Sequence, residues 1–459
     1  MIKQRIFLLF TSFLTLFLSK SWAQSQLLDS LALMEKRQYT SLEEALKEPE
    51  KVFRLDLSNY GADTWGDNTS TLTDLPETIA KLVNLQELDL SENKLSALPN
   101  AIGELKNLQY LYVQTNQIKS LPAAIGKLTN LKRLNLEANR LISLPAELKN
   151  LVSLKALDLD QNTFSDFPVV ITQLSNLEEL YIHSNSLQDI PPQIGNLKKL
   201  KNLEIWDNHI AKLPKEIGGL VSLERLDANS NAITALPANI GKLANLKSLG
   251  MTENSLASLP ADFGLLKNLS KIDLSYNSLV GLPAEIGNLQ SLTVLDLTSN
   301  QLASVPAEIG KLSNLEELDL NVNKLTTLPK EISNLKKIKE LVLFQNEITS
   351  LPAEIGNMSD LASIDLNSNK LTTLPKEISM LKNVQVLVLW GNKLTNLPDE
   401  ICEMGGLMAI ELQDNQLTIL PTCINKLSGL IKIDLTQNKV TEAEKKRLTE
   451  LFPAAQLDF

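Results

Sequence analysis

Apolar and polar positions follow a pattern that returns every 23 residues along most of the chain. One copy runs from Leu295 to Glu317 and reads LDLTSNQLASVPAEIGKLSNLEE, and the next copy starts at Leu318. The Leu-x-Leu pair in each copy alternates with period two, which predicts a short strand with one buried face. The L-P-x-x-I-G-x-L segment that follows predicts a compact helical turn, with the proline at its first position, where a missing amide donor does no harm.

Two residue columns hold this period without insertion or deletion. Prolines recur in steps of 23 from Pro76 to Pro421. Asparagines recur in the same step at positions 93, 116, 139, 162, 185, 208, 231, 254, 277, 300, 323, 346, 369, 392, 415 and 438. A fixed period of this size is typical of a solenoid, in which a unit can bury its apolar side only against its neighbours. We therefore expect the strands of adjacent units to pair into one long parallel sheet.

The repeated pattern L-x-x-L-x-L-x-x-N-x-L-x-x-L-P-x-x-I-G-x-L covers residues 52–440 and resembles the leucine-rich repeat family. Its LP-x-x-I-G form is similar to bacterial repeats and to the plant intracellular Ras-group-related repeat proteins. The resemblance implies an α/β leucine-rich repeat solenoid, a curved horseshoe with a concave parallel β-sheet, convex short helical turns and helical caps at both ends. It also implies a role in interaction or scaffolding.

The expected domains follow from where this pattern starts and stops. Residues 1–23 carry Lys3 and Arg5, an apolar run and a final Ser-Trp-Ala, which is typical of a cleaved secretory signal peptide. Residues 24–51 form an N-terminal helical cap, and residues 441–459 form a C-terminal one. The repeat domain, 52–440, consists of a degenerate first coil and sixteen regular units. The surplus residues of the first coil, 61–73, predict a surface loop that carries Trp65. We expect a secreted or periplasmic protein with no integral membrane segment after cleavage.

Both caps carry a capping-box pattern, in which a hydroxyl and a carboxylate satisfy each other's backbone donors. In the first cap the pair is Ser41 and Glu44, and Pro49 is expected to end the helix. In the second cap the pattern starts at Thr441 and predicts a helix to about Leu451. The apolar side chains expected to cover the last core are Leu448, Leu451 and Phe452. Residues 455–459 are expected to add an edge strand.

The asparagine column has a predicted structural role. After each strand the chain turns inward and leaves backbone groups without partners. A side-chain amide offers two donors and an acceptor, so each asparagine can bond to its own turn and to its neighbour's. Representative members of this ladder are Asn93, Asn254, Asn300 and Asn438.

Charge and composition exclude several functions. There are 44 Lys and Arg against 54 Asp and Glu, and loss of residues 1–23 would leave 41 against 54. An acidic chain does not fit non-specific binding to nucleic acid, which depends on cationic contacts to phosphates. The two histidines show no metal-ligand spacing, and no phosphate loop or nucleophile motif occurs. We therefore expect no enzyme activity, no cofactor and no metal site.

Three residues per unit are expected to face solvent on the strand side: the residue before Leu-x-Leu, the one inside it and the one after it. Asp273, Asp296 and Asp319 form an acidic run in the inner column. Such a run could attract a cation, although Asp is also an ordinary residue at this position of the family's repeats. Rare aromatic and apolar residues in these columns are better candidates for a binding surface. The candidate residues form two groups: Tyr181, His183, Trp206 and Asp207, and Val342, Phe344, Val388 and Trp390.

The two cysteines leave one question open. Cys402 and Cys423 lie in adjacent units near the end of the repeats, and in an exported protein they could form a disulfide. Their positions within the repeat differ by two residues, which could also keep them too far apart.

These observations predict an exported, non-enzymatic and monomeric protein that binds an unidentified protein partner through its concave face. One alternative is binding to a carbohydrate or another cell-surface ligand, with tryptophans as stacking platforms. A second is an intracellular signalling scaffold, against which residues 1–23 argue.

Overall fold

The computed structural model describes residues 27–59 and 71–459. The chain divides between Asn185 and Ser186 into two compact units, which are described separately. The expected signal peptide, Trp65 and most of the expected loop lie outside the described residues. Among the described residues, no helix has the length and apolar character needed to cross a bilayer.

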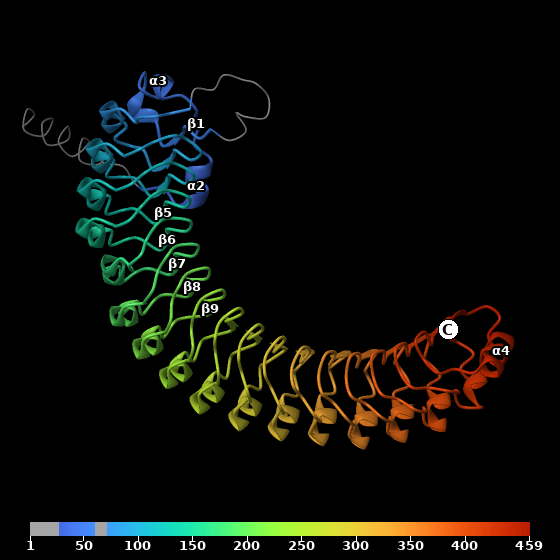
Figure 1. Ribbon diagram of the computed structural model, residues 1–459. Helices are drawn as coiled ribbons and strands as arrows, with labels where there is room; N and C mark the ends of the chain where they lie inside the picture. The colour runs from blue at the N-terminus through green and yellow to red at the C-terminus, as the bar shows by residue number, and fades with distance from the viewer. Residues whose placement is uncertain (1–26, 60–70) are drawn as a thin grey trace, which may run out of the picture. The chain divides into compact units, whose positions relative to one another are not determined.

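From residue 27 on, the described part of the first unit has two short α-helices, a two-residue strand and a 3-10 turn, and then alternates strands with 3-10 turns (Figure 1). The initial elements are α2 (Ser30–Met34), β1 (Gln38–Tyr39), α3 (Leu42–Ala45) and η1 (Pro49–Lys51). The strands that follow are β2 (Arg54–Asp56), β3 (Glu87–Asp89), β4 (Tyr110–Tyr112), β5 (Arg133–Asn135), β6 (Ala156–Asp158) and β7 (Glu179–Tyr181). The 3-10 turns between them are η2 (Glu77–Lys81), η3 (Asn100–Glu104), η4 (Ala123–Lys127), η5 (Ala146–Asn150) and η6 (Val169–Gln173).

The second unit continues the alternation and ends with an α-helix and a final strand. Its strands are β8 (Asn202–Glu204), β9 (Arg225–Asp227), β10 (Ser248–Gly250), β11 (Lys271–Asp273), β12 (Val294–Asp296), β13 (Glu317–Asp319), β14 (Glu340–Val342), β15 (Ser363–Asp365), β16 (Val386–Val388), β17 (Ala409–Glu411), β18 (Lys432–Asp434) and β19 (Gln456–Asp458). Its 3-10 turns are η7 (Pro192–Asn196), η8 (Lys215–Gly219), η9 (Ala238–Lys242), η10 (Ala261–Leu265), η11 (Ala284–Asn288), η12 (Ala307–Lys311), η13 (Lys330–Asn334), η14 (Ala353–Asn357), η15 (Lys376–Met380), η16 (Asp399–Glu403) and η17 (Ile424–Lys426). The helix α4 (Glu442–Leu451) precedes β19.

Neighbouring strands within each unit pair in parallel, with equivalent repeat positions side by side. In the second unit, for example, Ile272 pairs with Leu295 and Leu295 pairs with Leu318. Leu295, at the centre of β12, is 1% exposed, whereas its neighbours Val294 and Asp296 are half-buried on the opposite side. The period-two prediction is therefore confirmed, and the leucine columns form the core of a leucine-rich repeat solenoid.

The asparagine ladder connects successive repeats from inside the turn. Asn254 donates to the carbonyl of Met251 in its own repeat at 3.2 Å and to the carbonyl of Ala228 in the preceding repeat at 2.9 Å. Its amide oxygen accepts the N–H of Ile233 at 3.0 Å. The residue before each ladder asparagine has a positive φ, as at Val322, where φ is +54°. Each asparagine thus satisfies backbone groups that the tight turn removes from the sheet.

A second asparagine column, which the sequence analysis missed, lies nearer the surface. Its members donate to a backbone carbonyl 24 residues earlier, as Asn314 does to Gln290 at 2.8 Å. Asn84 donates to Glu50, 34 residues earlier, because the first coil is longer. The 24-residue bond is also made by Asn107, Asn130, Asn176, Asn245, Asn268 and Asn383. The sequence signal was the recurrent L-x-N-L tetrad, as in residues 312–315.

The predicted place of the repeat proline is wrong by one residue. Pro306 is the cap before η12 rather than its first residue, with an extended ψ of 152°. Its carbonyl accepts the N–H of Ile309 at 3.0 Å and so closes the turn. Proline suits this position because it lacks a backbone N–H but keeps its carbonyl, and the turn requires only the carbonyl as an acceptor.

The N-terminal cap differs from its prediction in two details. Pro49 begins the turn η1, whereas α3 already ends at Ala45. The strand β1 was not expected. It pairs in parallel with β2 and places Tyr39, which is buried, next to Leu55. The cap therefore extends the sheet by one strand as well as covering its end.

The C-terminal cap also differs in detail. Leu448 and Phe452 are buried, but Leu451 is 37% exposed and does not cover the core. Thr441 accepts the N–H of Glu444 at 3.2 Å, as a capping box requires. The carboxylate of Glu444 instead accepts the N–H of Leu420 at 2.9 Å, so the reciprocal half of the box is replaced by a bond to the last repeat.

Candidate functional site

The outward side of the strands carries the candidate residues. We call this surface the strand face; it consists, in each repeat, of the residue before the two buried strand positions, the one between them and the one after them. In the repeat of β12 these outward residues are Val294, Asp296 and Thr298, and all three are half-buried. Because the buried leucines hold each strand in register, outward residues of equivalent position lie side by side across neighbouring strands.

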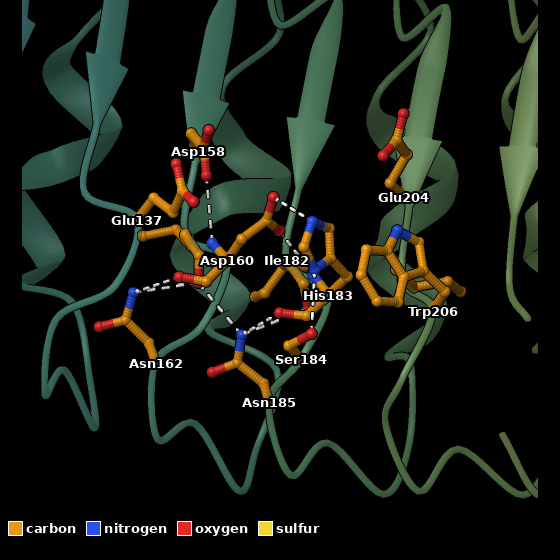
Figure 2. Close-up of polar contacts among 12 residues, drawn as sticks. Glu137, Asp158, Asp160, Asn162, Ile182, His183, Ser184, Asn185, Glu204 and Trp206 are labelled. Atoms are coloured by element: carbon orange, nitrogen blue, oxygen red, sulfur yellow. Dashed lines mark hydrogen bonds and ion pairs between the residues drawn. The ribbon is translucent and has the colours of Figure 1, made fainter. Parts of the chain in front are cut away.

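In the first unit, the strand face holds a connected group of ionisable residues, shown in Figure 2. The ring of His183 forms an ion pair with Asp160, with 2.6 Å between Nε2 and Oδ2. The backbone N–H of His183 donates to the other oxygen of Asp160 at 2.7 Å. Asp160 in turn donates its backbone N–H to Asp158 Oδ1 at 3.2 Å. Of these residues, only His183 was expected from the sequence. Asp158 belongs to the ordinary acidic inner column, whereas Asp160 stands in the next outward column, where an acid is rare and could have been noticed.

The carboxyl of Asp158 has a strongly perturbed acidity. Burial, together with the negative charges of Asp160 and Glu137, raises the pKa of Asp158 to about 7. The hydrogen bond from the backbone N–H of Asp160 acts in the opposite direction, as does the ring of His183 when it carries a proton. Asp158 therefore changes its charge near neutral pH, because a carboxylate that loses water without a full counter-charge keeps its proton.

Tyr181 lies beside this group and takes part in an ionic contact that spans three strands. Its hydroxyl donates to Glu179 at 3.3 Å. Glu179 also accepts from Arg133 at 2.8 Å, although the two residues are separated by β6. The strand between them contributes only the small, buried Ala156 at this position. Because alanine is so small, the side chains of Arg133 and Glu179 can form an ion pair across the middle strand.

Trp206 and Asp207 belong to the second unit, whereas Tyr181 and His183 belong to the first. Trp206 follows β8 and is half-buried, and Asp207 is exposed. Asp207 has a φ of +52° and donates its backbone N–H to the carbonyl of Asn229 at 3.0 Å, so it serves the turn. The expected grouping of these four residues remains a prediction.

The second candidate group lies within the second unit, on β14–β16 and the residues that follow them. Val342 pairs with Asp365, and Asp365 pairs with Val388, so the two valines flank one carboxylate. Phe344 is half-buried and Trp390 is 39% exposed. The structure thus brings all four residues of this group onto neighbouring strands.

The polar residues between these apolar side chains bond to each other. Asn367 donates its side-chain amide to Asp365 Oδ1 at 2.6 Å, and its backbone N–H to the same oxygen at 3.0 Å. Asp365 is therefore held in place by Asn367. The result is an apolar surface with a fixed polar centre, which suits recognition of another molecule better than non-specific adhesion.

A hollow interrupts the acidic column next to Gly250. This glycine replaces the outward acid of β10, and a side chain there would meet the amide of Asn229 at 2.9 Å. The hollow measures about 270 Å³ and is lined by residues that include Arg225, Lys271 and Asp273. Glycine in an otherwise acidic column was the sequence signal that could have revealed it. Among the described residues, no set of three His, Cys, Asp or Glu side chains is arranged to hold a metal ion.

The structure joins Cys402 and Cys423 in a disulfide, with 5.9 Å between the two Cα atoms. Cys402 lies in η16 and Cys423 caps η17. The offset of two positions is accommodated because η17 is shorter than the other repeat turns and starts later.

Family models for leucine-rich repeats match most of the chain. A model described as leucine-rich repeat region matches residues 66–140, 123–208, 192–278 and 272–369, and a second leucine-rich repeat model matches 382–440. The chain belongs to the leucine-rich repeat family. The members of this family are generally non-catalytic. A comparison with curated protein sequences finds no match.

Solved structures of leucine-rich repeat proteins are also similar. A Leptospira interrogans leucine-rich repeat protein is 38% identical, with 92% of this chain and 100% of that one covered and a TM-score of 0.72. The Arabidopsis thaliana receptor kinase GASSHO1/SCHENGEN3, solved as an ectodomain with CASPARIAN STRIP INTEGRITY FACTOR 2, is 32% identical, with 82% and 50% covered and a TM-score of 0.60. The Arabidopsis receptor kinase HAESA, with a peptide hormone and a co-receptor, is 24% identical, with 86% and 71% covered and a TM-score of 0.63, and shows the fold alone.

Proposed function

We propose that this protein acts outside the cytoplasm and binds another protein through the strand face of its second unit, without chemistry of its own. The observation that carries the proposal is the apolar group on β14–β16. Val342, Phe344, Val388 and Trp390 stand on a face whose other outward residues are mostly polar or charged. Aromatic and aliphatic side chains that remain exposed on such a face are typical anchors of protein interfaces.

Two further observations support the proposal. The disulfide between Cys402 and Cys423 fits an oxidising compartment, since disulfides seldom persist in the cytosol. The plant receptor ectodomain that is 32% identical was solved with a bound partner, which supports a binding role for the shared repeats. This chain spans half of that receptor's length, so the receptor's own partner is not transferred to it.

The test is affinity capture from envelope and medium proteins of the source organism. The wild-type protein is compared with a Phe344→Ala, Trp390→Ala double variant. A matched control, Val221→Ala with Ile419→Ala, removes two exposed apolar side chains outside the strand face. We expect one partner to be retained by the wild type and the control and lost by the double variant. Retention by all three proteins would place the binding surface elsewhere.

Binding to a surface glycan is a second candidate, because Trp390 is exposed and stands between Asn367 and Gln413 in the same outward column. An exposed aromatic ring beside amide groups can stack on a sugar ring while the amides bond to its hydroxyls. A glycan array with wild-type protein and Trp390→Ala tests this candidate. Signals that survive the substitution would rule out Trp390 as the stacking residue.

A further inference from the structure

The sheet of the second unit opens at one junction, between β13 and β14. Only Leu318 with Leu341 and Asp319 with Val342 are paired there, whereas the adjacent junctions pair three residues. At the junction before it, Glu316 donates its N–H to the carbonyl of Thr293 at 2.9 Å. The equivalent bond to the carbonyl of Glu316 is absent from the described structure. A hollow of about 650 Å³ lies at the opened end.

The second asparagine column is interrupted at the same place, as it also is at Ser291 and Gly406, where the strands still pair over three residues. Lys337 stands where this column would have an asparagine, and Asp360 occupies the next position. Lys337 donates its ammonium to the side chain of Asn314 at 2.8 Å instead of bonding to a backbone carbonyl. Two successive repeats therefore lack the hydrogen bond from an outer-column asparagine to a backbone carbonyl of the preceding repeat.

The hollow has an excess of negative charge. Its ionisable lining consists of five acids and two bases: Glu316, Glu317, Asp319, Glu340 and Asp360, with Lys337 and Lys339. Among the described residues, none of these five acids forms an ion pair. Glutamates at the same outward position in the first unit are paired, Glu87 with Arg54 at 3.0 Å and Glu179 with Arg133 at 2.8 Å. The fold thus supplies arginine partners elsewhere and none at this junction.

Within the described residues, Asp319 lacks the hydrogen bond that its equivalents in the two preceding repeats have. The equivalent Asp273 accepts the hydroxyl of Ser275 at 2.7 Å, and Asp296 accepts the N–H of Thr298 at 2.8 Å. No such hydrogen bond to Asp319 occurs in the described part of the chain. Burial raises the pKa of Asp319, and the charges of Asp296, Glu317 and Glu340 raise it further. A carboxylate in these surroundings gains from a positive neighbour.

The residues next to Asp319 continue the site toward the proposed binding surface. Asn321, two residues later, is 7% exposed, and its amide oxygen has no hydrogen-bond partner in the structure. Val342 pairs with Asp319 across the junction, and Phe344 follows it. An unsatisfied acid and amide oxygen therefore lie beside an apolar patch. This arrangement is complementary to a cation on a chain that also presents an apolar side chain.

We infer that the hollow between β13 and β14 receives one arginine side chain from an extended segment of the partner protein, whose neighbouring apolar side chain lies on Phe344. The guanidinium fits better than an ammonium, because its planar set of donors can bond to two carboxylates at once and stack on a ring. The inference rests on the proposed function and specifies the chemistry of the partner.

Synthetic peptide pools test this inference without knowledge of the partner. Fluorescein-labelled random decapeptides, made with arginine, citrulline, leucine or glutamate at the fifth position, are titrated with the purified protein and followed by anisotropy. Citrulline keeps the shape of arginine without its charge. The variants are Asp319→Asn and the matched control Asp273→Asn, which removes the same charge from the same outward column two repeats away. Thermal melting of each variant verifies that it is folded.

We expect the arginine pool to bind about tenfold more tightly than the citrulline pool, and Asp319→Asn to abolish most of that difference while Asp273→Asn keeps it. Equal binding of the arginine and citrulline pools would overturn the inference, and so would equal losses in the two variants or no binding at all. If all pools bind alike but fail with Phe344→Ala, Trp390→Ala, the proposed function stands without the arginine. If the double variant binds the peptide pools as tightly as the wild type does, the proposed surface itself is wrong.

Discussion

Replacing Asn300 with alanine tests whether the asparagine ladder stabilises the solenoid by satisfying backbone groups. Asn300 is 7% exposed and accepts the N–H of Leu279 at 2.9 Å. It donates to the carbonyls of Leu274, Leu297 and Thr298 at 2.9, 3.1 and 3.2 Å. Alanine leaves the N–H of Leu279 without a partner in a buried turn and removes one of the two hydrogen bonds to the carbonyl of Leu274, which still accepts from Asn277 at 3.1 Å. Because one buried orphan costs about 1–3 kcal/mol and the lost hydrogen bonds to the carbonyls add about 1 kcal/mol, we expect a loss of about 2–4 kcal/mol in the free energy of unfolding.

The assay is urea unfolding followed by far-UV circular dichroism, with two companion variants. Asn314→Ala makes the same chemical change in the outer asparagine column, where water can replace its bond to Gln290, and should cost less than about 1 kcal/mol. Asn254→Ala, in a partly exposed ladder position, should fall between the two, at about 1–3 kcal/mol. The slopes with urea must agree among the variants for the comparison to hold, because repeat arrays can lose cooperativity. An Asn300→Ala protein as stable as Asn314→Ala would refute the reasoning.

Three further predictions concern other features of the fold. Val322, a β-branched residue with a φ of +54°, should give a protein about 1 kcal/mol more stable when replaced by asparagine, and a lower urea midpoint would contradict the strain argument. Replacing Cys402 and Cys423 by serine opens a loop of 21 residues and should lower the free energy of unfolding by about 3 kcal/mol, whereas an unchanged melting temperature would show that the loop is constrained by other contacts. Asp158 has a folded-state pKa of about 7 against an ordinary 3.8, so the folded protein binds a proton between these values that the unfolded chain lacks. Its ionisation therefore lowers stability as the pH rises through this window, and Asp158→Asn should be more stable than wild type by about 2–3 kcal/mol above neutral pH, with the difference shrinking toward pH 4. A difference independent of pH in urea titrations at both ends of the window would contradict that assignment.

The proposed binding surface could be selected from the sequence only in part. Val342, Phe344, Val388 and Trp390 stood out because apolar residues are rare in the outward columns, and register then places them on adjacent strands. The opening beside them could not be derived in this way. It is seen only in the backbone pairing of β13 with β14, because other repeats that lack the same asparagine, such as the one with Ser291, keep complete pairing.

The sequence by itself determined the features that repeat. The Leu-x-Leu strands, their parallel register and the inner asparagine ladder follow from the 23-residue period, because each involves groups within one unit or between adjacent copies. Tertiary structure decided the features that differ between copies. It paired Arg133 with Glu179 across an intervening strand, joined Cys402 to Cys423, and left Asp319 without the hydrogen bond that Asp273 has. The physical reason is that a side chain's charge state and partners depend on neighbours one or two repeats away, and a shared period does not specify which residues those neighbours are.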